Sequence, residues 1–467
     1  MLSKTDFMLF LEAPMHLWAK THQCIHIESP TPMESFLAQQ GQSIESLAKT
    51  YIEANILPHY ENPQFYLQQI FDDGRFQIRT DALIYNTDLQ SYALYEIKSS
   101  TSVSNQHKYD LAFQVLLLQS QIAIEQVFVL HVNKDYCLED KFDLSQFFTV
   151  TNVLPDMEKH LQKVYKLRES AYQVTKIDEP QPGFACTKPN TCPCPDLCHP
   201  NLPDHPIYEI SYIGKKAVKL REMGITAAND IPASFDLNPK QKKQTKAIQQ
   251  NSPIINREEI KYVLSQMQFP LYFLDYETFN PALPLFRNYH PYDPIVFQYS
   301  LFIINAPGKA SSHLDCLVTG SKDPAYEIVK SLLSNLGEVG SVIVWNQSFE
   351  ARCNRKLASY CPQYADRLMV INERLFDLML IFKDGLYVHP DFHGSASLKA
   401  VLPVLCPELS YKKLSIGNGE QAMLTWEAIF HGRIPQDSLD EIRQDLKTYC
   451  KLDTWGMVRI WQELKSL

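Results

Sequence analysis

The sequence of 467 residues lacks a long apolar run. Its most apolar stretch, 111–132, is interrupted by polar residues such as Gln114 and Gln119, whereas a membrane-spanning helix needs about 20 predominantly apolar residues. The first apolar run contains Asp6 and Glu12 and therefore does not have the pattern of a signal peptide. We expect a cytoplasmic protein that has no membrane partner.

Basic residues are in the minority, since 44 Lys and Arg stand against 53 Asp and Glu and the formal net charge is −9. This balance excludes a uniformly basic nucleic-acid binder, but it permits an enzyme with an acidic metal site and a local basic surface. Residues 211–249 form such a local zone, with eight Lys and Arg against three Asp and Glu. The segment Ile213-Gly214-Lys215-Lys216 resembles half of a helix-hairpin-helix motif, which implies phosphate contacts by the two lysines. A solvated connecting helix is the alternative.

Disulfide bonds are not expected, because cytoplasmic thiols stay reduced, although the sequence has 11 cysteines. Four of them, Cys186, Cys192, Cys194 and Cys198, lie close together in a proline-rich segment. Four thiolates in one loop favour a metal site. Their spacings of five, one and three intervening residues do not give the two Cys-x2–4-Cys pairs that are usual for zinc. Both zinc and an iron–sulfur cluster therefore remain open at this point.

The length suggests two to four domains, at roughly 100–200 residues per domain. The element pattern is α/β and predicts two domains, 1–200 and 269–467, with a basic helical linker over 201–268. In the first domain we expect a helix over 33–55, strands over 65–71, 76–85 and 92–97, a helix over 108–122 and a strand over 126–132. In the second we expect strands over 271–275, 295–304 and 312–318, a helix over 326–336, a strand over 342–345 and a long final helix.

Two carboxylates end the first strand expected in the second domain. Asp275 and Glu277 are spaced i, i+2, so strand alternation places them on the same face. Adjacent carboxylates repel each other unless a cation lies between them, and oxygen ligands suit a hard divalent metal. A solvated strand end is the alternative for this pair taken alone.

Two later segments add to this pair. Glu350 follows the strand expected over 342–345, on the first turn of a helix, and Tyr449 and Asp453 are spaced i, i+4 on the final helix. With Asp275 and Glu277, these carboxylates would supply four ligands for two metal ions, which can stabilise the attacking and leaving oxygens of a phosphodiester. Tyr449 would then orient or deprotonate the attacking water.

Three motifs resemble those of the DnaQ-like 3′–5′ exonucleases, which have an RNase H-like fold. They are Asp275-Tyr-Glu277-Thr278, Asn346-Gln-Ser-Phe349-Glu350 and Tyr449-x-x-x-Asp453. The resemblance implies a 3′–5′ exonuclease of the tyrosine subgroup that acts on DNA or RNA with two Mg²⁺ or Mn²⁺ ions and has Asn346 near the nucleic acid. Glu350 replaces the usual Asp, and the extra methylene moves the carboxylate by about 1.5 Å.

The segment Gly394-Ser-Ala-Ser-Leu398-Lys399 is similar to one in a bacterial family of unknown function that carries this exonuclease fold. Lys399 is a candidate phosphate contact, with a solvated lysine as the alternative. Asp377 is expected either to support the acidic site or to cap a turn.

A second acidic constellation lies in the first domain. Asp81 is expected on the strand over 76–85, and Glu96 and Lys98 share a face of the next strand. Asp81 and Glu96 would hold one Mg²⁺, and Lys98 would orient a water or meet a phosphate. A salt bridge between neighbouring strands is the alternative.

The order of elements and the Asp…Glu-x-Lys set resemble the PD-(D/E)XK restriction-endonuclease-like core. Gly41-x-x-x-Glu45 looks like the Gly-x-x-x-His motif of the RecB-type branch, which implies Glu45 as a further ligand. Gln114 matches that branch's Gln-x-x-x-Tyr motif and its nucleic-acid contact, although Leu118 replaces the Tyr.

RecB-type nucleases often carry a four-iron four-sulfur cluster, and Cys186, Cys192 and Cys198 look like three of its ligands. Ala13 stands where the N-terminal ligand is expected, so Cys24 or Cys194 is the candidate fourth. The resemblance favours iron–sulfur over zinc.

Together these patterns predict a metal-dependent nuclease, most clearly a 3′–5′ exonuclease through the second domain. The alternative is a catalytically impaired nucleic-acid-binding protein that keeps a structural iron–sulfur or zinc site.

Overall fold

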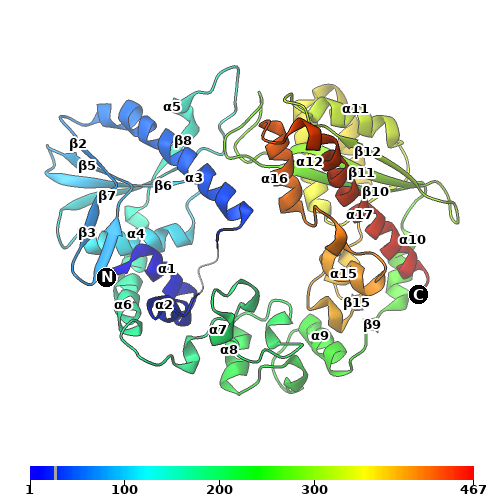
Figure 1. Ribbon diagram of the computed structural model, residues 1–467, viewed down its shortest axis with the longest axis horizontal. Coiled ribbons are helices and arrows are strands. Elements are labelled where there is room, and N and C mark those ends of the chain that lie inside the picture. The colour runs from blue at the N-terminus through cyan, green and yellow to red at the C-terminus, as the bar shows by residue number, and fades with distance from the viewer. Residues whose placement is uncertain (26–28) are drawn as a thin grey trace. The chain divides into compact units, whose positions relative to one another are not determined.

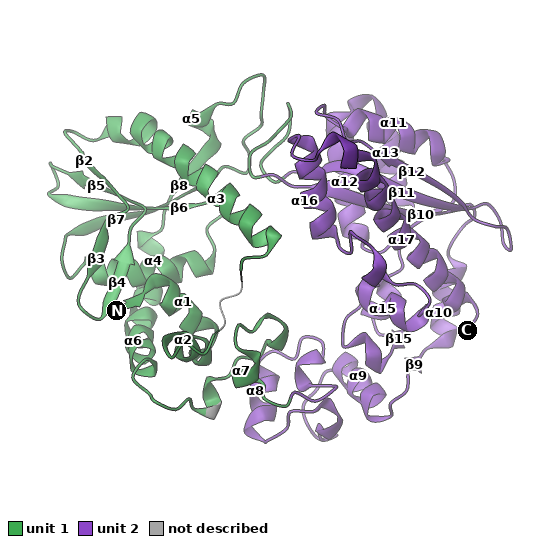
Figure 2. Ribbon diagram, viewed as in Figure 1, with its two compact units in different colours: residues 1–201, 282–292 green, residues 202–281, 293–467 purple. Residues whose placement is uncertain are grey.

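The computed structural model describes residues 1–25 and 29–467, without the side chain of Pro182. The chain is a mixed α/β protein that forms two compact units (Figures 1 and 2). Unit 1 comprises residues 1–201 and 282–292, and unit 2 comprises residues 202–281 and 293–467. None of the described helices has the length and apolar character that a membrane crossing requires.

Unit 1 contains a five-stranded sheet in the order β2-β5-β6-β7-β8, in which β6 and β7 are parallel and the other pairs antiparallel. The strands are β2 (Gln64–Leu67), β5 (Ala82–Asn86), β6 (Ser91–Lys98), β7 (Ile124–Val132) and β8 (Phe148–Asn152). A smaller sheet, in the order β1-β4-β3, contains β1 (Leu2–Ser3), β4 (Phe76–Arg79) and β3 (Ile70–Asp72).

Helices cover both faces of the larger sheet of unit 1. One face packs against α3 (Pro32–Tyr51) and α5 (Leu144–Phe147). The other face packs against α1 (Lys4–Glu12), α2 (Pro14–Thr21), α4 (Asn105–Leu118) and α6 (Glu158–Val174). The helix expected over 33–55, the strand over 92–97, the helix over 108–122 and the strand over 126–132 are present as α3, β6, α4 and β7.

The position of Asp81 differs from the expectation. The strand expected over 76–85 is broken into β4 and β5, and Asp81 lies in the break rather than on a strand. The break occurs because β4 pairs with β3 in the small sheet whereas β5 pairs with β6 in the large one. The strand expected over 65–71 is divided in the same way at Gln68, whose φ is 54°.

Unit 2 contains a five-stranded sheet in the order β12-β11-β10-β13-β14. Its strands are β10 (Leu271–Phe279), β11 (Ile295–Ile304), β12 (Ser312–Leu317), β13 (Ser341–Val344) and β14 (Leu375–Asp377). β11 is antiparallel to β10 and β12, whereas β13 is parallel to β10 and β14. All ten residues of β11 are buried, as expected for an inner strand with helices on both faces.

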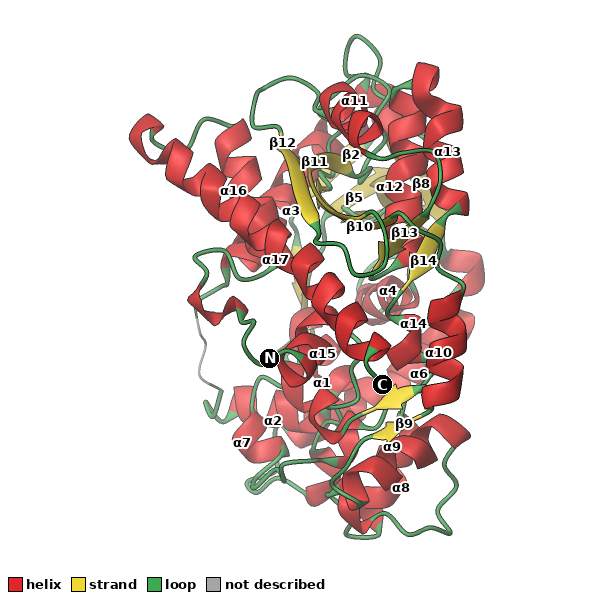
Figure 3. Cartoon of the chain, turned by 90° about the vertical axis from the view of Figure 1, so that its right-hand side faces the viewer, coloured by secondary structure: helices red, strands yellow, loops and turns green. Residues whose placement is uncertain are grey.

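Helices enclose the sheet of unit 2 on both faces (Figure 3). One layer contains α11 (Ala325–Asn335), α12 (Gln347–Tyr360) and α13 (Ala365–Glu373), and the other contains α10 (Arg257–Ser265), α15 (Leu398–Leu405) and α17 (Leu439–Lys465). Shorter elements are β9 (Ile254–Ile255), α14 (Leu380–Lys383), β15 (Tyr387–Val388) and α16 (Gly419–Phe430). The strands and the helix expected over 271–345 are all present.

The expected domain limits need two corrections. Residues 202–268 of the expected linker are part of unit 2, where α8 (Lys215–Glu222) and α9 (Pro239–Gln249) enclose a small apolar core of their own. Residues 282–292, between β10 and β11, belong to unit 1. They do so because Ala282 is buried in the core beside α3 and its N–H donates to Gln40 Oε1 at 2.7 Å.

Candidate active site

The acidic pair on β10 faces the layer that contains α17. Leu271 and Phe273 pack into that layer, so alternation directs Asp275 and Glu277 to the same side. Asp275, Glu277 and Cys450 of α17 each offer a ligand atom, and these atoms all lie within 4.8 Å of one another. The structure thus places the predicted pair of carboxylates against the last helix.

α17 also carries the second predicted pair beside this group, although Asp453 and Glu350 are not among the ligand atoms that lie within 4.8 Å of one another. Tyr449 and Asp453 are both buried, and they lie one helical turn apart. Asp453 accepts hydrogen bonds from the hydroxyls of Tyr411 and Tyr449. The Tyr411 hydroxyl donates to Asp453 Oδ1. The repulsion of Asp453 also raises the pKa of Asp275, so these carboxylates interact electrostatically.

Glu350 lies on the first turn of α12, after the end of β13, and only 2% of its surface is exposed. Its Oε2 is buried and has no hydrogen-bond partner among the described residues. Asp377, at the end of β14, supports this turn because its Oδ2 accepts the Gln347 N–H at 3.1 Å. A buried carboxylate oxygen without a partner is costly, and this position of Glu350 Oε2 therefore suits a cation or a hydrogen-bond donor.

Burial raises the pKa values of all four carboxylates, and repulsion from neighbouring carboxylates adds to this rise in three of them. Burial and then repulsion from neighbouring carboxylates raise the pKa values of Asp275, Glu277 and Glu350 well above the usual range. Burial also raises the pKa of Asp453 to about 6, although the two tyrosine hydroxyls and Lys399 oppose this rise. Lys399 likewise lowers the pKa of Glu277 without offsetting its burial.

Lys399 is the predicted basic residue at this site. Its Nζ donates to the Gly417 carbonyl at 3.0 Å and lies 5.4 Å from the ring centre of Tyr411 and 5.5 Å from that of Tyr449. Asn346 precedes α12, is exposed, and accepts a hydrogen bond from the Ser348 hydroxyl at 2.7 Å. Contacts of either residue with nucleic acid remain predictions.

The donor set fits hard divalent cations, because oxygen ligands and excess negative charge are what Mg²⁺ and Mn²⁺ select.

Sequence reasoning missed Tyr411 and Cys450. Cys450 Sγ donates weakly to Asp275 Oδ2 at 3.8 Å, and burial raises its pKa well above the usual value. Its position between Tyr449 and Asp453 was the available signal, whereas nothing in the sequence around Tyr411 relates it to Asp453.

The acidic constellation of unit 1 is organised differently. Glu96 Oε1 accepts hydrogen bonds from Lys98 at 2.7 Å and Lys4 at 2.9 Å, and Glu96 Oε2 accepts one from Gln114 Nε2 at 2.7 Å. Asp110 pairs with the same two lysines at 3.1 and 3.4 Å. Both oxygens of Glu96 therefore have donors from the chain itself. Sequence reasoning missed Lys4 and Asp110, although Asp110 and Gln114 are spaced i, i+4 on α4.

The pKa values of Glu96 and Asp81 follow from burial and from the charges around these two carboxylates. Burial alone would raise the pKa of Glu96, but the attraction of Lys4 and Lys98 outweighs it and lowers this pKa to about 2. Burial and then Glu96 raise the pKa of Asp81 to about 7, although its Oδ2 accepts the Ile97 N–H at 2.8 Å.

Glu45 has partners outside these ion pairs. Its Oε1 pairs with Lys49 at 3.0 Å and accepts a hydrogen bond from Gln68 Nε2 at 2.9 Å. Gln68 also donates its backbone N–H to the Asp81 carbonyl at 3.2 Å. The predicted residue therefore lies beside the Asp81 backbone, and within the described part of the chain its carboxylate is paired with Lys49 and Gln68 rather than with Glu96.

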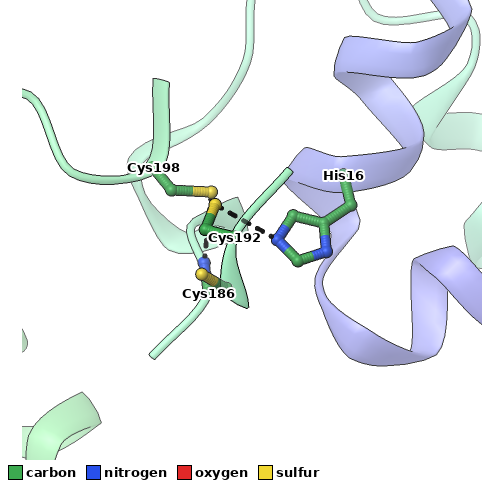
Figure 4. A group of neighbouring side chains, drawn as sticks. All are labelled: His16, Cys186, Cys192 and Cys198. Atoms are coloured by element: carbon green, nitrogen blue, oxygen red, sulfur yellow. Dashed lines mark hydrogen bonds between the residues drawn. The ribbon is translucent and has the colours of Figure 1, made fainter. Parts of the chain in front are cut away.

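The cysteine cluster includes a residue that was not predicted. His16 of α2 joins Cys186, Cys192 and Cys198, and one ligand atom from each lies within 4.8 Å of all the others (Figure 4). Cys194 lies outside this group of four, with its Sγ 3.8 Å from Cys198 Sγ. His16 is three residues from Ala13, where the resemblance leads one to expect a cysteine, and this proximity was the available signal.

The other candidate for the fourth ligand, Cys24, is exposed, and its Sγ donates to the His22 carbonyl at 3.4 Å.

In the basic zone, Lys215 is exposed, whereas Lys216 Nζ donates to Gln241 Oε1 at 3.3 Å. Gly214 precedes both lysines with a φ of 50°. Nucleic-acid contacts of this zone remain predictions.

The fold and its acidic cluster define a mixed α/β unit with a candidate site for divalent cations. A family model described as a domain of unknown function (DUF2779) matches residues 272–397, which run from β10 to the residue before α15. This range contains Asp275, Glu277 and Glu350 but ends before Tyr449 and Asp453.

Three curated proteins are similar to part of the chain. "Uncharacterized protein UU173" of Ureaplasma parvum is 26% identical over 42% of this chain and 31% of its own length. "Uncharacterized protein MG366 homolog" of Mycoplasma pneumoniae is 26% identical over 43% and 33%. "Uncharacterized protein MG366" of Mycoplasma genitalium is 24% identical over 40% and 31%. The aligned part of the chain thus spans about a third of these relatives, and no solved structure matches it.

Proposed function

We propose that unit 2 is a metal-dependent nuclease of the DnaQ-like type, which removes nucleotides from the 3′ end of DNA or RNA. The observation that carries this proposal is the buried acidic cluster of Asp275, Glu277, Glu350 and Asp453, in which Glu350 Oε2 has no hydrogen-bond partner among the described residues. The sheet order β12-β11-β10-β13-β14, with β11 antiparallel to both neighbours, supports an RNase H-like fold.

The four carboxylates would hold Mg²⁺ or Mn²⁺ in this proposal. Bound there, two such ions would supply charge stabilisation for the attacking and leaving oxygens of the phosphodiester. The protein positions the ligands on three elements that pack together, because β10 carries two of them, α12 one and α17 one. Asp377 holds the first turn of α12 and thereby fixes the direction of Glu350.

Tyr449 and Lys399 have supporting roles in the same proposal. The Tyr449 hydroxyl, which already bonds Asp453, orients the attacking water. Lys399 lies over the rings of Tyr411 and Tyr449, so its ammonium group is beside the cluster and available to a phosphate oxygen.

For unit 1 we propose a PD-(D/E)XK-like fold that contributes nucleic-acid binding rather than cleavage. The order of helices and strands supports this fold, and the saturated Glu96 carboxylate favours binding, because Lys4, Lys98 and Gln114 occupy both of its oxygens. The same reasoning retains a non-cleaving nucleic-acid-binding protein as the second candidate function for the whole chain.

The test is degradation of end-labelled DNA and RNA oligonucleotides, single- and double-stranded, with Mg²⁺ or Mn²⁺. We expect 3′-terminal shortening by the wild type and a loss of at least about 10³-fold in Asp275→Asn. Glu441→Gln, an exposed change on α17, is the matched control and should keep full activity. Full activity of Asp275→Asn, or binding without turnover of every oligonucleotide by the wild type, would refute the enzyme.

A further inference from the structure

The cysteine cluster of unit 1 does not have the composition of an all-cysteine iron–sulfur site. Its four grouped donors are one imidazole and three thiols, from His16, Cys186, Cys192 and Cys198. Four-iron clusters are usually held by four cysteines, whereas three cysteines and one histidine are a common set for structural zinc. The donor chemistry therefore favours a single zinc ion.

The spacing of the donors favours the same ion. Zinc bonds of about 2.3 Å to sulfur and about 2.0 Å to nitrogen, in a tetrahedron, place neighbouring ligand atoms about 3.5–3.8 Å apart. Cys192 Sγ and His16 Nε2 lie 3.5 Å apart, and all four donors lie within 4.8 Å of one another. A four-iron cluster binds each ligand through a different iron, so its ligands surround a larger body and lie farther apart than those around one ion.

His16 has the environment of a metal ligand. It is 3% exposed, and its Nε2 points to the sulfurs (Figure 4). Its Nδ1 is buried, has no hydrogen-bond partner among the described residues, and lies 3.5 Å from the Glu12 carboxylate one helical turn earlier. Metal-binding histidines direct the second ring nitrogen to such a carboxylate, which fixes the tautomer.

We propose that this chain binds one zinc ion through His16, Cys186, Cys192 and Cys198, and that it does not carry a four-iron four-sulfur cluster. The ion would join α2 to the segment around Cys186–Cys198, which is far away in the sequence and contains only short helical turns such as α7 (Pro195–Cys198). Such a bond closes a long loop, and metal affinity then adds directly to the stability of unit 1. This role does not depend on nuclease activity.

The experiment measures zinc and iron per chain in full-length protein purified without oxygen from cells supplied with both metals. The expected result is one zinc, iron below about 0.1 per chain, and no visible charge-transfer absorbance from iron–sulfur bonds. Zinc-edge X-ray absorption of the wild type should give three sulfur ligands and one nitrogen. Four irons per chain, or four sulfur ligands on zinc, would overturn the proposal.

Four variants, two of them controls, test the assignment of the ligands. His16→Ala should reduce zinc content at least about tenfold, and His16→Cys should restore it with four sulfur ligands. Cys194→Ser is the matched control and should keep one zinc. His393→Ala should also keep it, because His393 belongs to a separate group with His205 and Glu209. The assignment would be contradicted if Cys194→Ser lost its zinc or if His16→Ala kept all of it. If His16→Ala does not fold, the X-ray absorption spectrum of the wild type decides which atoms bind the zinc.

Discussion

Two buried acidic clusters in this chain differ in what neutralises them. In unit 1, Lys4 and Lys98 neutralise Glu96 and Asp110 through contacts of 2.7–3.4 Å. In unit 2, Lys399 lowers the pKa values of Glu277 and Asp453 but hydrogen-bonds a carbonyl rather than a carboxylate. Burying a charge is costly unless it is paired, so the proposal of a bound divalent cation rests on the unit 2 cluster rather than on the unit 1 cluster.

This difference separates two clusters that look alike as motifs. Asp275-x-Glu277 and Asp81…Glu96-x-Lys98 both predict metal ligands, but folding acts on them differently. Burial and repulsion raise the pKa values of Asp275 and Glu277 well above the usual range, whereas Lys4 and Lys98 lower the pKa of Glu96 to about 2. The neutralising partner Lys4 lies 92 residues from Glu96, so a local motif cannot reveal it. We therefore expect the two clusters to respond in opposite ways to mutation and to pH.

The largest expected effect is on turnover. Glu350→Gln should reduce Mn²⁺-dependent shortening of a labelled oligonucleotide by about 10³-fold, because a ligand charge is lost. Glu96→Gln should change turnover by less than about 3-fold, provided that the folded fraction is corrected for. The reverse result, with unit 1 decisive and unit 2 dispensable, would assign the chemistry to the other cluster.

The second effect is on the free energy of unfolding without added divalent ions. Glu96→Gln should destabilise unit 1 by about 3 kcal/mol, because Lys4 and Lys98 lose the charge they are paired with. Asp275→Asn should stabilise unit 2, because it removes a carboxyl group whose ionisation is disfavoured by burial and by repulsion from Asp453, the two causes that raise its pKa. Urea denaturation at pH 8, followed separately for the two units, measures both signs, and equal signs would contradict the comparison.

The third effect is a dependence on pH. The pKa of Asp453 is about 6 in the fold against 3.8 ordinarily, so the folded state binds more protons in this window and unit 2 loses about 3 kcal/mol as pH rises through it. Mn²⁺ should offset this loss and raise Tm more at pH 8 than at pH 5. A Tm increase that does not depend on pH would exclude proton-linked metal binding.

In unit 1, ionisation of Glu96 makes stability increase with pH, whereas ionisation of Asp81 makes stability decrease with pH. The lowered pKa of Glu96 provides stability above pH 4.5 that is lost as pH falls towards about 2. The raised pKa of Asp81, about 7, costs stability as pH rises from 3.8 to 7, and Asp81→Asn should remove that slope. Mn²⁺ should leave the unit 1 profile unchanged, and a profile that shifts with Mn²⁺ would indicate a metal at Asp81.

The smallest expected effect concerns the hydroxyl group of Tyr449. Tyr449→Phe should lower turnover by about 10-fold, which corresponds to one lost hydrogen bond, and should keep the Mn²⁺ concentration for half-activation unchanged. A shift of that Mn²⁺ concentration by more than about 10-fold would mean that Tyr449 supports the ligands through Asp453 and does not orient water.

The sequence predicted those parts of the site that depend on local periodicity. Alternation along β10 placed Asp275 and Glu277 on one face, and the helical spacing placed Tyr449 above Asp453. Three features depend on contacts distant in sequence and could not be predicted in this way. They are the Tyr411 hydrogen bond to Asp453, the Lys4 pairing with Glu96 and the His16 contact with Cys192.

The fold was predictable to a similar degree. The elements of both units follow from their apolar patterns, but the break at Asp81 depends on β4 and β5 joining different sheets. Strand propensity does not record which sheet a strand will join, so one continuous strand was the natural expectation.

The excursion of residues 282–292 into unit 1 has a practical consequence for dissecting this protein. A fragment that ends at residue 201 would lack Ala282, and it would leave the apolar surface beside α3 uncovered. A fragment that begins at residue 202 would carry an eleven-residue segment whose apolar side chains have lost their binding site. Truncation is therefore a poor way to assign an activity to either half, and point substitutions in the intact chain are the sounder approach.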